Sequence, residues 1–240
     1  MGCICSSEED PDAPTVPYPK KESTQGQTAK SSQDMSTLDL SKSNDVIDFE
    51  AMNPRRHKDT TTLIIKENML ATFPAGIRNF TSLRTFDCSM NRLEELPSEI
   101  GLLVSLTILD ANDNSLTKLP DDIGNLVKLE KLFLYKNNIT TLPDSICNLS
   151  ALKEFNLFNN KIIKLPTKLS NLHNMVELNL ADNKLKTTPD LSGFTTLNRL
   201  ALFNNNLVLL PPLSKLGNLE KLEIYRNKLE SLPNMSELDN

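Results

Sequence analysis

Apolar residues recur along most of this chain in a pattern with a period of 22 or 23 residues. The clearest copy, Leu129 to Ala151, reads LEKLFLYKNNITTLPDSICNLSA, with apolar residues at positions 1, 4, 6, 11, 14, 18 and 21. Eight copies follow one another over residues 60–240, and only Thr60 and Thr188 interrupt the apolar positions if alanine and cysteine are counted as apolar. This periodicity predicts stacked units that share one continuous hydrophobic core.

Asparagine and proline recur in phase with the apolar residues. Successive asparagines are 23 residues apart five times and then 22 residues apart twice. Proline follows each asparagine after six residues, so two separate residue types keep the same spacing. The asparagines are Asn68, Asn91, Asn114, Asn137, Asn160, Asn183, Asn205 and Asn227. An asparagine amide turned inward can hydrogen-bond the backbone of the neighbouring repeat, which predicts a structural ladder along the stack.

The alternation within each copy predicts where its strand lies. Positions 4 and 6 point into the core, while positions 3, 5, 7 and 8 point outward. Short strands of successive copies then pair into one parallel sheet, and the proline opposes a long helix on the opposite side. We therefore predict an α/β solenoid: a horseshoe with a parallel concave β-sheet and a mostly irregular or 3-10 convex side.

The pattern divides the chain into three parts. Residues 60–240 form the eight repeats, of which the sixth and seventh lose one residue after the proline and should have a tighter convex side. Residues 35–59 are interpreted as an N-terminal cap or degenerate half repeat, because Leu38 and Leu40 are spaced like strand leucines although Asn44 comes one place late. No polar cap follows the eighth repeat, which leaves its edge open to pairing with a second copy.

The repeat resembles the leucine-rich repeat, and its details resemble one group within that family. Leucine-proline in almost every unit, followed by Ile-Gly-Asn-Leu at residues 123–126, is similar to the Ras-group intracellular proteins of the Ras-suppressor and Ras–Raf scaffold types. That resemblance covers residues 60–240. It implies protein–protein binding in signalling, often with small GTPases or phosphatases, although a fold alone does not establish a function.

The N-terminus, MGCICSS, satisfies the pattern for N-myristoylation at Gly2, with Ser6 at the required place. One myristoyl chain binds membranes only marginally, so stable attachment needs a second signal. The residues that follow are acidic, which leaves palmitoylation of Cys3, Cys5 or both as the local candidate. The start resembles the dual-acylated N-termini of Src-type kinases and G-protein α subunits. An unmodified start, or cysteines that bind metal or sense redox state, are the alternatives.

Residues 1–34 are interpreted as a lipidated, disordered tether, because from Ser7 onward they are rich in Ser, Thr, Pro, Gln and charge. The cluster Pro54 to Lys58, with the sequence PRRHK, is either a solvated cap loop or a contact for anionic lipid headgroups. We expect the protein on the cytoplasmic face of the plasma membrane or an endomembrane, and in the cytoplasm if it is not acylated.

Five aromatic residues occupy outward strand positions in the second half of the repeats, which predicts a binding patch on the concave face. The alternative is that these rings favour strands and stack between repeats. Repeats two and three instead present Asp87, Asp110 and Asp113 and are more acidic. The predicted partner-binding residues are Phe133, Tyr135, Lys136, Phe158, Arg199, Phe203, Tyr225 and Arg226.

Charge and composition exclude several classes of function. A net charge of −5 and a pI of about 5.2 disfavour nucleic acid as a partner. His57 and His173 are the only histidines, neither has a convincing catalytic setting, and no zinc, phosphate-loop or calcium-loop spacing occurs. We expect no enzyme, no catalytic residue, no cofactor and no metal.

These features together predict a membrane-anchored adaptor that binds a signalling protein on its concave face. The alternatives are a regulatory subunit or inhibitor of a small GTPase or protein phosphatase, and a structural protein of the membrane or cytoskeleton.

Overall fold

The computed structural model describes residues 36–43, 47, 57–73 and 75–232. The residues predicted to be acylated, the tether over residues 1–34 and most of the basic cluster at 54–58 lie outside this part of the chain.

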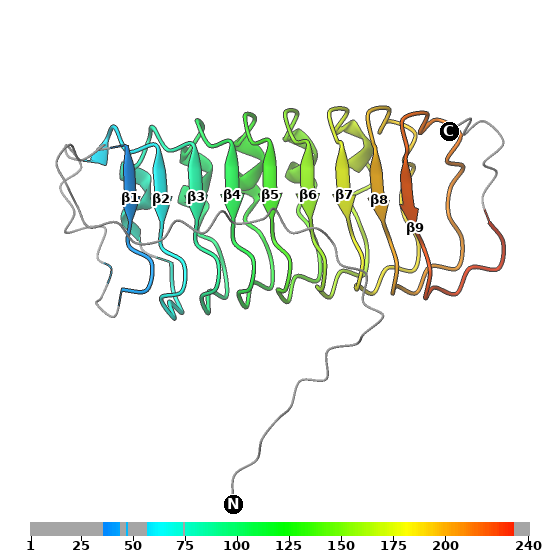
Figure 1. Cartoon of the computed structure of the whole chain (residues 1–240), viewed down its shortest axis with the longest axis horizontal. Helices are drawn as coiled ribbons and strands as arrows, with labels where there is room; N and C mark the ends of the chain where they lie inside the picture. The colour runs from blue at the N-terminus through cyan, green and yellow to red at the C-terminus, as the bar shows by residue number, and fades with distance from the viewer. Residues whose placement is uncertain (1–35, 44–46, 48–56, 74, 233–240) are drawn as a thin grey trace, which may run out of the picture. The chain divides into compact units, whose positions relative to one another are not determined.

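Within the described residues, nine short strands form one parallel sheet in which chain order equals spatial order (Figure 1). Each strand is three residues long and covers positions 3 to 5 of its repeat. The strands are β1 (Thr37–Asp39), β2 (Thr62–Ile64), β3 (Thr85–Asp87), β4 (Ile108–Asp110), β5 (Lys131–Phe133), β6 (Glu154–Asn156), β7 (Glu177–Asn179), β8 (Arg199–Ala201) and β9 (Lys221–Glu223). The predicted parallel sheet is confirmed.

The register never slips between neighbouring strands, so equal template positions always pair. Leu109 of β4, for example, pairs with Leu132 of β5, and Leu132 pairs with Phe155 of β6. These central side chains are at most 1 % exposed and belong to one core cluster that runs the length of the stack. A slip of one residue would turn all of them outward, so burial of this face fixes the register.

The asparagine ladder ties each repeat to the preceding one. The Asn137 Nδ2 group donates to the carbonyl oxygens of Leu134 and Ala111, both at 3.0 Å, and Asn137 Oδ1 accepts from the Leu116 backbone N–H at 2.9 Å. The other ladder asparagines repeat these bonds, except that Asn68 Oδ1 is buried without a partner. Each amide thus satisfies backbone groups that the turn after the strand leaves unpaired.

The residue before each ladder position adopts a left-handed backbone, which sequence reasoning did not anticipate. Nine non-glycine residues at this place, position 8, have φ between 53° and 60°. They are Lys42, Glu67, Met90, Asp113, Lys136, Asn159, Asp182, Asn204 and Arg226. Asparagine and aspartate tolerate this conformation better than other side chains, which matches their presence in four of the nine.

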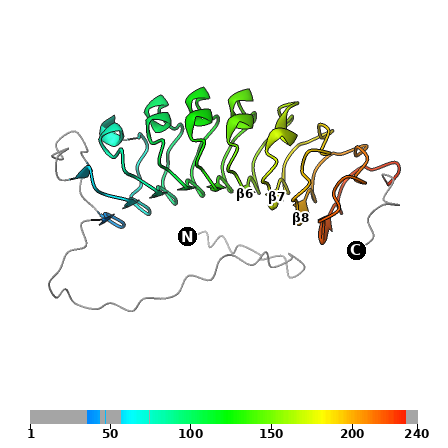
Figure 2. The ribbon, with the colours of Figure 1, turned by 90° about the horizontal axis from the view of Figure 1, so that it is seen from above.

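The opposite side of the stack consists of turns and short 3-10 helices (Figure 2). In repeats two to four a proline with an extended backbone immediately precedes the helix. The helices are η1 (Ala75–Asn79), η2 (Ser98–Leu102), η3 (Asp121–Asn125), η4 (Asp144–Asn148) and η5 (Leu169–Asn171). The mostly irregular or 3-10 convex side is therefore also confirmed.

Repeats six and seven lack a 3-10 helix among the residues that the structure describes. Turns at residues 192–193 and 214–215 take the place of the helix, where each repeat is one residue shorter. Gly193 lies close to the preceding repeat: a Cβ atom there would lie 2.2 Å from the Ser170 carbonyl oxygen.

Strand β1 extends the sheet into the segment interpreted as a cap. Thr37 pairs with Thr62, which places Leu38 and Leu40 at the two inward positions, and both pack against the core. Ser43, rather than an asparagine, then follows the left-handed Lys42. At the other end, Leu222 and Ile224 are only partly buried.

Candidate functional site

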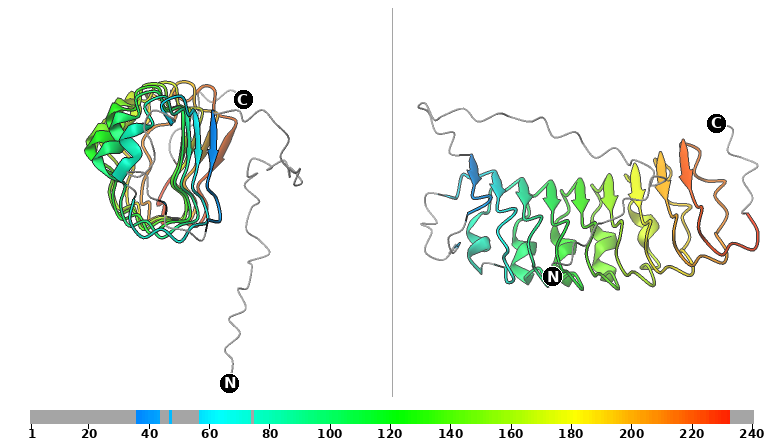
Figure 3. Two further views of the ribbon diagram at one scale, coloured as in Figure 1. Left: turned by 90° about the vertical axis from the view of Figure 1, so that its left-hand side faces the viewer. Right: turned by 60° about the horizontal axis from the view of Figure 1, so that its bottom comes forward.

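The candidate site is the outward face of the sheet, opposite the 3-10 helices (Figure 3, left). In β2 to β6 the middle residue is buried and the two flanking residues are partly exposed. Positions 3, 5 and 7 of successive repeats therefore stand side by side in columns. Any ligand of this face meets those columns, because the alternate positions are in the core.

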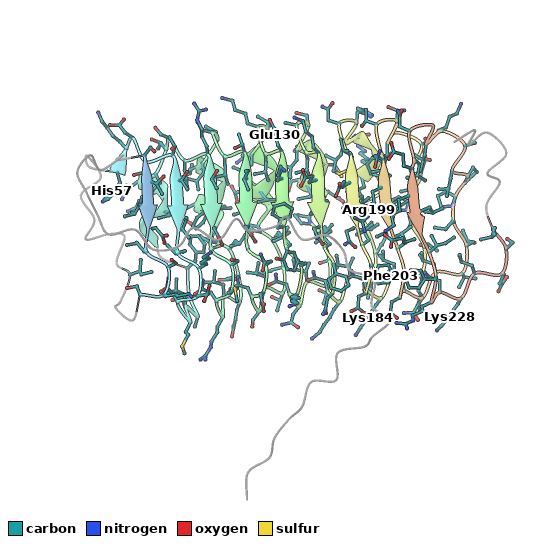
Figure 4. All side chains as sticks on the ribbon, viewed as in Figure 1. His57, Glu130, Lys184, Arg199, Phe203 and Lys228 are labelled. Atoms are coloured by element: carbon teal, nitrogen blue, oxygen red, sulfur yellow. The ribbon has the colours of Figure 1, made fainter. Side chains whose placement is uncertain are left out.

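Three rings from repeats five, seven and eight gather into what we call the aromatic cluster: Phe158, Phe203 and Tyr225. The rings of Phe203 and Tyr225 stack with centroids 4.7 Å apart and an interplanar angle of 5°. Phe158 and Phe203 are tilted by 46° with centroids 6.3 Å apart. The rings thus form a continuous apolar strip on the outward face of β6 to β9, of which Figure 4 labels the central ring, Phe203.

Two alanines make this cluster possible. Ala181 occupies the same position in repeat six as Phe158 and Phe203 do in repeats five and seven. Ala181 and Ala201 are buried together with Phe203 in a cluster separate from the main core, and Phe158 packs against it. Because an alanine has only a Cβ atom, rings two repeats apart reach each other across it. The sequence contains both alanines, but their importance depends on the spacing of the strands.

The rings are unequally available to a partner. Phe203 is only 8 % exposed, whereas Tyr225 is 41 % exposed and Phe158 is partly buried. Stacking between repeats, the alternative considered from the sequence, therefore describes these three rings. Phe133 and Tyr135, both from repeat four, are also partly buried. What remains for a partner is the outer rim of the strip rather than five fully exposed rings.

Most of the charges beside the cluster are paired within the protein. Lys131 Nζ lies 2.6 Å from Glu154 Oε1, across the β5–β6 pair. Glu223 is 8 % exposed, and its Oε2 atom forms an ion pair with the Arg199 guanidinium group at 3.2 Å. Lys221 reaches the same carboxylate at 3.2 Å.

Three cations were predicted to contact a partner, and the first of them, Arg199, forms an ion pair with Glu223. Lys136 Nζ lies 3.9 Å from Asp113 Oδ2. Arg226, the third, is exposed at a left-handed position.

Burial raises the pKa of the Tyr225 hydroxyl, and the nearby Glu223 carboxylate raises it further. The phenol consequently stays protonated at neutral pH and can donate a hydrogen bond. The strip therefore ends in one polar group on an otherwise apolar surface.

The aspartates on the outward face of repeats two and three bind the protein's own backbone, so their presence does not by itself indicate an acidic binding surface. Asp87 Oδ1 accepts hydrogen bonds from the Ser89 backbone N–H at 3.1 Å and from the Ser89 hydroxyl at 2.5 Å. Asp110 Oδ1 accepts from the backbone N–H and the side-chain amide of Asn112. In the same way, Asn156 Oδ1 accepts a hydrogen bond from the backbone N–H of Phe158, two residues later. An Asp or Asn at position 5 thus caps the backbone after the strand.

The two histidines contact an aromatic ring and a backbone carbonyl group, respectively. The His57 ring lies 5.6 Å from the Phe80 ring, and His173 Nδ1 lies 3.2 Å from the Gly193 carbonyl oxygen. Burial raises the pKa of the Cys88 thiol well above its ordinary value, and burial followed by the Asp144 charge raises that of Cys147. Both thiols are therefore poor nucleophiles at neutral pH.

Two further features concern only the part of the chain that the structure describes. No helix there is long and apolar enough to cross a bilayer. No three His, Cys, Asp or Glu side chains within the same residues gather closely enough to hold a metal ion.

Asp190 is exposed, and hydrogen bonds from Ser192 lower the pKa of its carboxyl.

Several solved structures resemble this one. A leucine-rich-repeat protein of Leptospira interrogans is 32 % identical over 77 % of this chain and 48 % of its own, with a TM-score of 0.73. YopM, a leucine-rich effector protein from Yersinia pestis, is 27 % identical over 82 % of this chain and 51 % of its own, with a TM-score of 0.69. The plant peptide hormone receptor RGFR1, in complex with RGF2, is 26 % identical over 80 % of this chain and 32 % of its own, with a TM-score of 0.68.

This chain thus spans about half or less of the length of these structures. No curated protein sequence matches it. Residues 111–239, more than half of the chain, match the family model described as the leucine-rich repeat region. With nine parallel strands, an asparagine ladder and a 3-10 convex side, the chain belongs to the leucine-rich-repeat family, whose fold commonly mediates protein–protein interaction.

Proposed function

We propose that this protein is a membrane-anchored adaptor that binds a signalling protein on the outward face of β5 to β9. One observation carries the proposal: an aromatic strip lies on this face beside cations that are largely neutralised by neighbouring carboxylates. Paired charges attract a charged partner weakly, whereas the rim of Tyr225 and Phe158 offers apolar area. The expected partner therefore presents an apolar or aromatic side chain to the strip.

The length of the face suits an extended protein segment. Neighbouring strands lie roughly 4.8 Å apart, so the five strands from β5 to β9 extend over about 20 Å. An extended peptide of about six residues has that length. The receptor RGFR1, which shares this fold, was solved in complex with RGF2. A protein segment lying across the strands is the geometry that we propose here.

The resemblance to Ras-group proteins suggests a small GTPase or a protein phosphatase as the partner. An adaptor would hold such a partner at the membrane without altering its turnover, whereas a regulatory subunit or inhibitor would change it. Comparison of GTP or phosphopeptide hydrolysis with and without the purified protein separates these two functions. A structural protein would instead assemble with itself, and sedimentation at increasing concentration tests that.

The anchor rests on the N-terminal sequence. We propose myristoylation at Gly2 and palmitoylation at Cys3, Cys5 or both, since one acyl chain alone holds a protein weakly. Intact mass and membrane fractionation of protein made in eukaryotic cells test this, with Gly2→Ala beside Cys3→Ser/Cys5→Ser. Lipid-sized mass increments and release of both variants into the cytosol are expected. An unmodified, soluble wild type would remove the anchor and leave a soluble binding module.

Site-specific cross-linking tests the binding face. A photoreactive phenylalanine analogue in place of Tyr225 should capture one partner in cells, whereas the same analogue in place of Val127 should not. Val127 is a matched control because it is 49 % exposed but lies beyond the 3-10 helix η3, away from the outward face of the sheet. Phe158→Ala should weaken capture at position 225. Identical adducts from both positions would contradict a concave binding face.

A further inference from the structure

The loops that follow strands β6, β7 and β9 carry a row of exposed lysines along one edge of the sheet. Figure 4 shows two of them, Lys184 and Lys228, at the edge opposite Glu130, which precedes β5. Lysine recurs at position 10 in repeats five, six and eight, and at positions 12 or 13 in repeats five and six. We call the row the basic edge; it consists of Lys161, Lys164, Lys184, Lys186 and Lys228.

The lysines of the basic edge differ from those elsewhere on the same side. Lys118, in repeat three, forms an ion pair with Glu95 at 3.8 Å. Among the described residues, none of the five basic-edge lysines makes such a pair. The carboxylates along this stretch are Asp182, which accepts a hydrogen bond from Asn204, and Glu230. The edge thus carries an excess of positive charge on a protein whose net charge is negative.

The backbone holds this row rigidly. Lys161 N–H donates to the Ile139 carbonyl oxygen and Lys184 N–H donates to that of Ile162, each at 2.9 Å. These bonds repeat from one unit to the next, so the loops form a ladder beside the sheet. Equal positions in neighbouring repeats are roughly 5 Å apart, which places Lys161 and Lys184 close together. Like charges at that spacing repel each other, and an anionic surface would relieve the repulsion.

Large apolar side chains project from two loops of this edge: the loop after β6, which also carries Lys161 and Lys164, and the loop after β8, which lies between the loops that carry Lys184 and Lys228. Ile163 is 57 % exposed, Leu209 is 55 % exposed and Val208 is 37 % exposed. They occupy positions 12 and 13, where repeats two and four have glutamate or threonine. Apolar side chains between lysines are what peripheral proteins use at a bilayer: the cations attract anionic headgroups, and the apolar groups enter the boundary region.

We infer that the basic edge rests on an anionic lipid bilayer, with Ile163 and Leu209 entering the headgroup region. This contact would orient the solenoid, because one end of each strand would then point toward the membrane. The outward face of the sheet would remain accessible from the side. The inference uses a surface distinct from the aromatic cluster and requires neither acylation nor a bound partner. An acidic protein is the other candidate occupant. Binding of such a protein would give no reason for the exposed apolar side chains on the loops of repeats five and seven.

Vesicle binding of the full chain, produced without acylation, tests the inference. The probe is phosphatidylcholine vesicles with and without phosphatidylserine, measured by co-sedimentation at two salt concentrations. We expect binding only when phosphatidylserine is present, and weaker binding at high salt. The edge variant is Lys161→Gln/Lys164→Gln/Lys184→Gln. The control variant, with the same change in charge on the opposite side, is Lys128→Gln/Lys168→Gln/Lys215→Gln.

Each lysine near an anionic surface contributes about fivefold in affinity, so the edge variant, which loses three lysines, should bind roughly a hundredfold more weakly. The control variant should bind like the wild type. Leu209→Ser should weaken binding without changing its salt dependence, and thermal unfolding should show that each variant is folded. Equal losses in the edge and control variants, or no binding of the wild type to phosphatidylserine, would overturn the inference. Because this protein carries no lipid, failure here leaves the proposed anchor and the concave partner untouched.

Discussion

The outward faces of repeats two and three and of repeats five to eight share one backbone but have opposite chemistry. Both stretches have the same strand register and the same asparagine ladder. At positions 5 and 7, however, the first stretch presents Asp87 and Asp110 followed by small polar residues, and the second presents Phe158 and Phe203. The core and ladder hold both stretches equally well, so the outward positions are free to differ.

Each stretch also uses part of its own surface. Asp87 and Asp110 each use one carboxylate oxygen to cap the backbone two residues later. Phe203 uses most of its ring area against Tyr225 and Phe158, and remains only 8 % exposed. On such a sheet, a column of acidic or aromatic residues is therefore only partly available to a partner, because the side chains also make contacts within the protein.

The largest expected effect tests what the two stretches share. Replacing Asn91 or Asn160 with alanine removes hydrogen bonds to two repeats and leaves buried backbone groups without partners. Each variant should lose about 3 kcal/mol of unfolding free energy, and the losses should be similar in the two stretches. Urea unfolding followed by circular dichroism measures this. Asn138→Ala, one residue beyond the ladder, is the control; a much smaller loss in either ladder variant would contradict a uniform scaffold.

The next effect contrasts two glycines on the convex side, one packed against the neighbouring repeat and one facing open space. A Cβ atom at Gly124, in η3, would lie 2.5 Å from the Ser145 carbonyl oxygen, whereas one at Gly217 meets no atom within 4 Å. We expect Gly124→Ala to cost about 2 kcal/mol through overpacking. Gly217→Ala should change stability by less than about 1 kcal/mol. Thermal unfolding of both variants provides the measurement, and equal shifts in melting temperature would contradict the tight packing of η3 against the following repeat.

Much of this architecture could be predicted from the sequence because it depends on positions within a repeat. The apolar positions, the ladder asparagines and the prolines recur at fixed spacing, so the parallel sheet and the convex side follow from counting. The deviation at Asn44 also has a structural counterpart, since Ser43 follows the left-handed residue in the cap.

The details of the candidate site could not be predicted in this way because they depend on contacts between repeats. The stacking of Phe203 on Tyr225 requires the distance between β8 and β9, and Arg199 reaches Glu223 only through that same geometry. The sequence shows these residues on one face but not which of them satisfy each other. The capping by Asp87 had a local signal, an Asp at position 5 followed two residues later by serine, and that signal was missed.

Replacing Phe203 with alanine should sharpen the difference between the two stretches. The ring lies outside the main core but is almost fully covered, so its loss should cost roughly 2 kcal/mol, less than the 3 kcal/mol or more typical of a core phenylalanine. The loss should be reduced when Tyr225 is already alanine, because the two rings stack. A double-mutant cycle by urea unfolding measures the coupling. Strictly additive losses would mean that the stack contributes nothing beyond burial of each ring.

The smallest effect concerns the left-handed residue, where the two stretches also differ. Repeat two has Met90 at this position with φ of 55°, whereas repeats five and seven have Asn159 and Asn204 with φ of 53°. Asparagine tolerates this conformation better than methionine, and Met90 is 43 % exposed, so little packing is lost on replacement. Met90→Asn should therefore raise the unfolding free energy by about 0.5 kcal/mol.

The reciprocal change in repeat seven should act in the opposite direction and more strongly. Asn204→Met introduces the backbone strain and also removes the hydrogen bond from Asn204 Nδ2 to Asp182 Oδ1, at 2.8 Å. We expect a loss of about 1 kcal/mol, measured by urea unfolding beside the Met90→Asn variant. If both changes had the same sign, backbone preference at this position would not govern stability. The tolerance of repeat two for methionine would then require a contact of the Met90 side chain, which truncation to alanine would reveal.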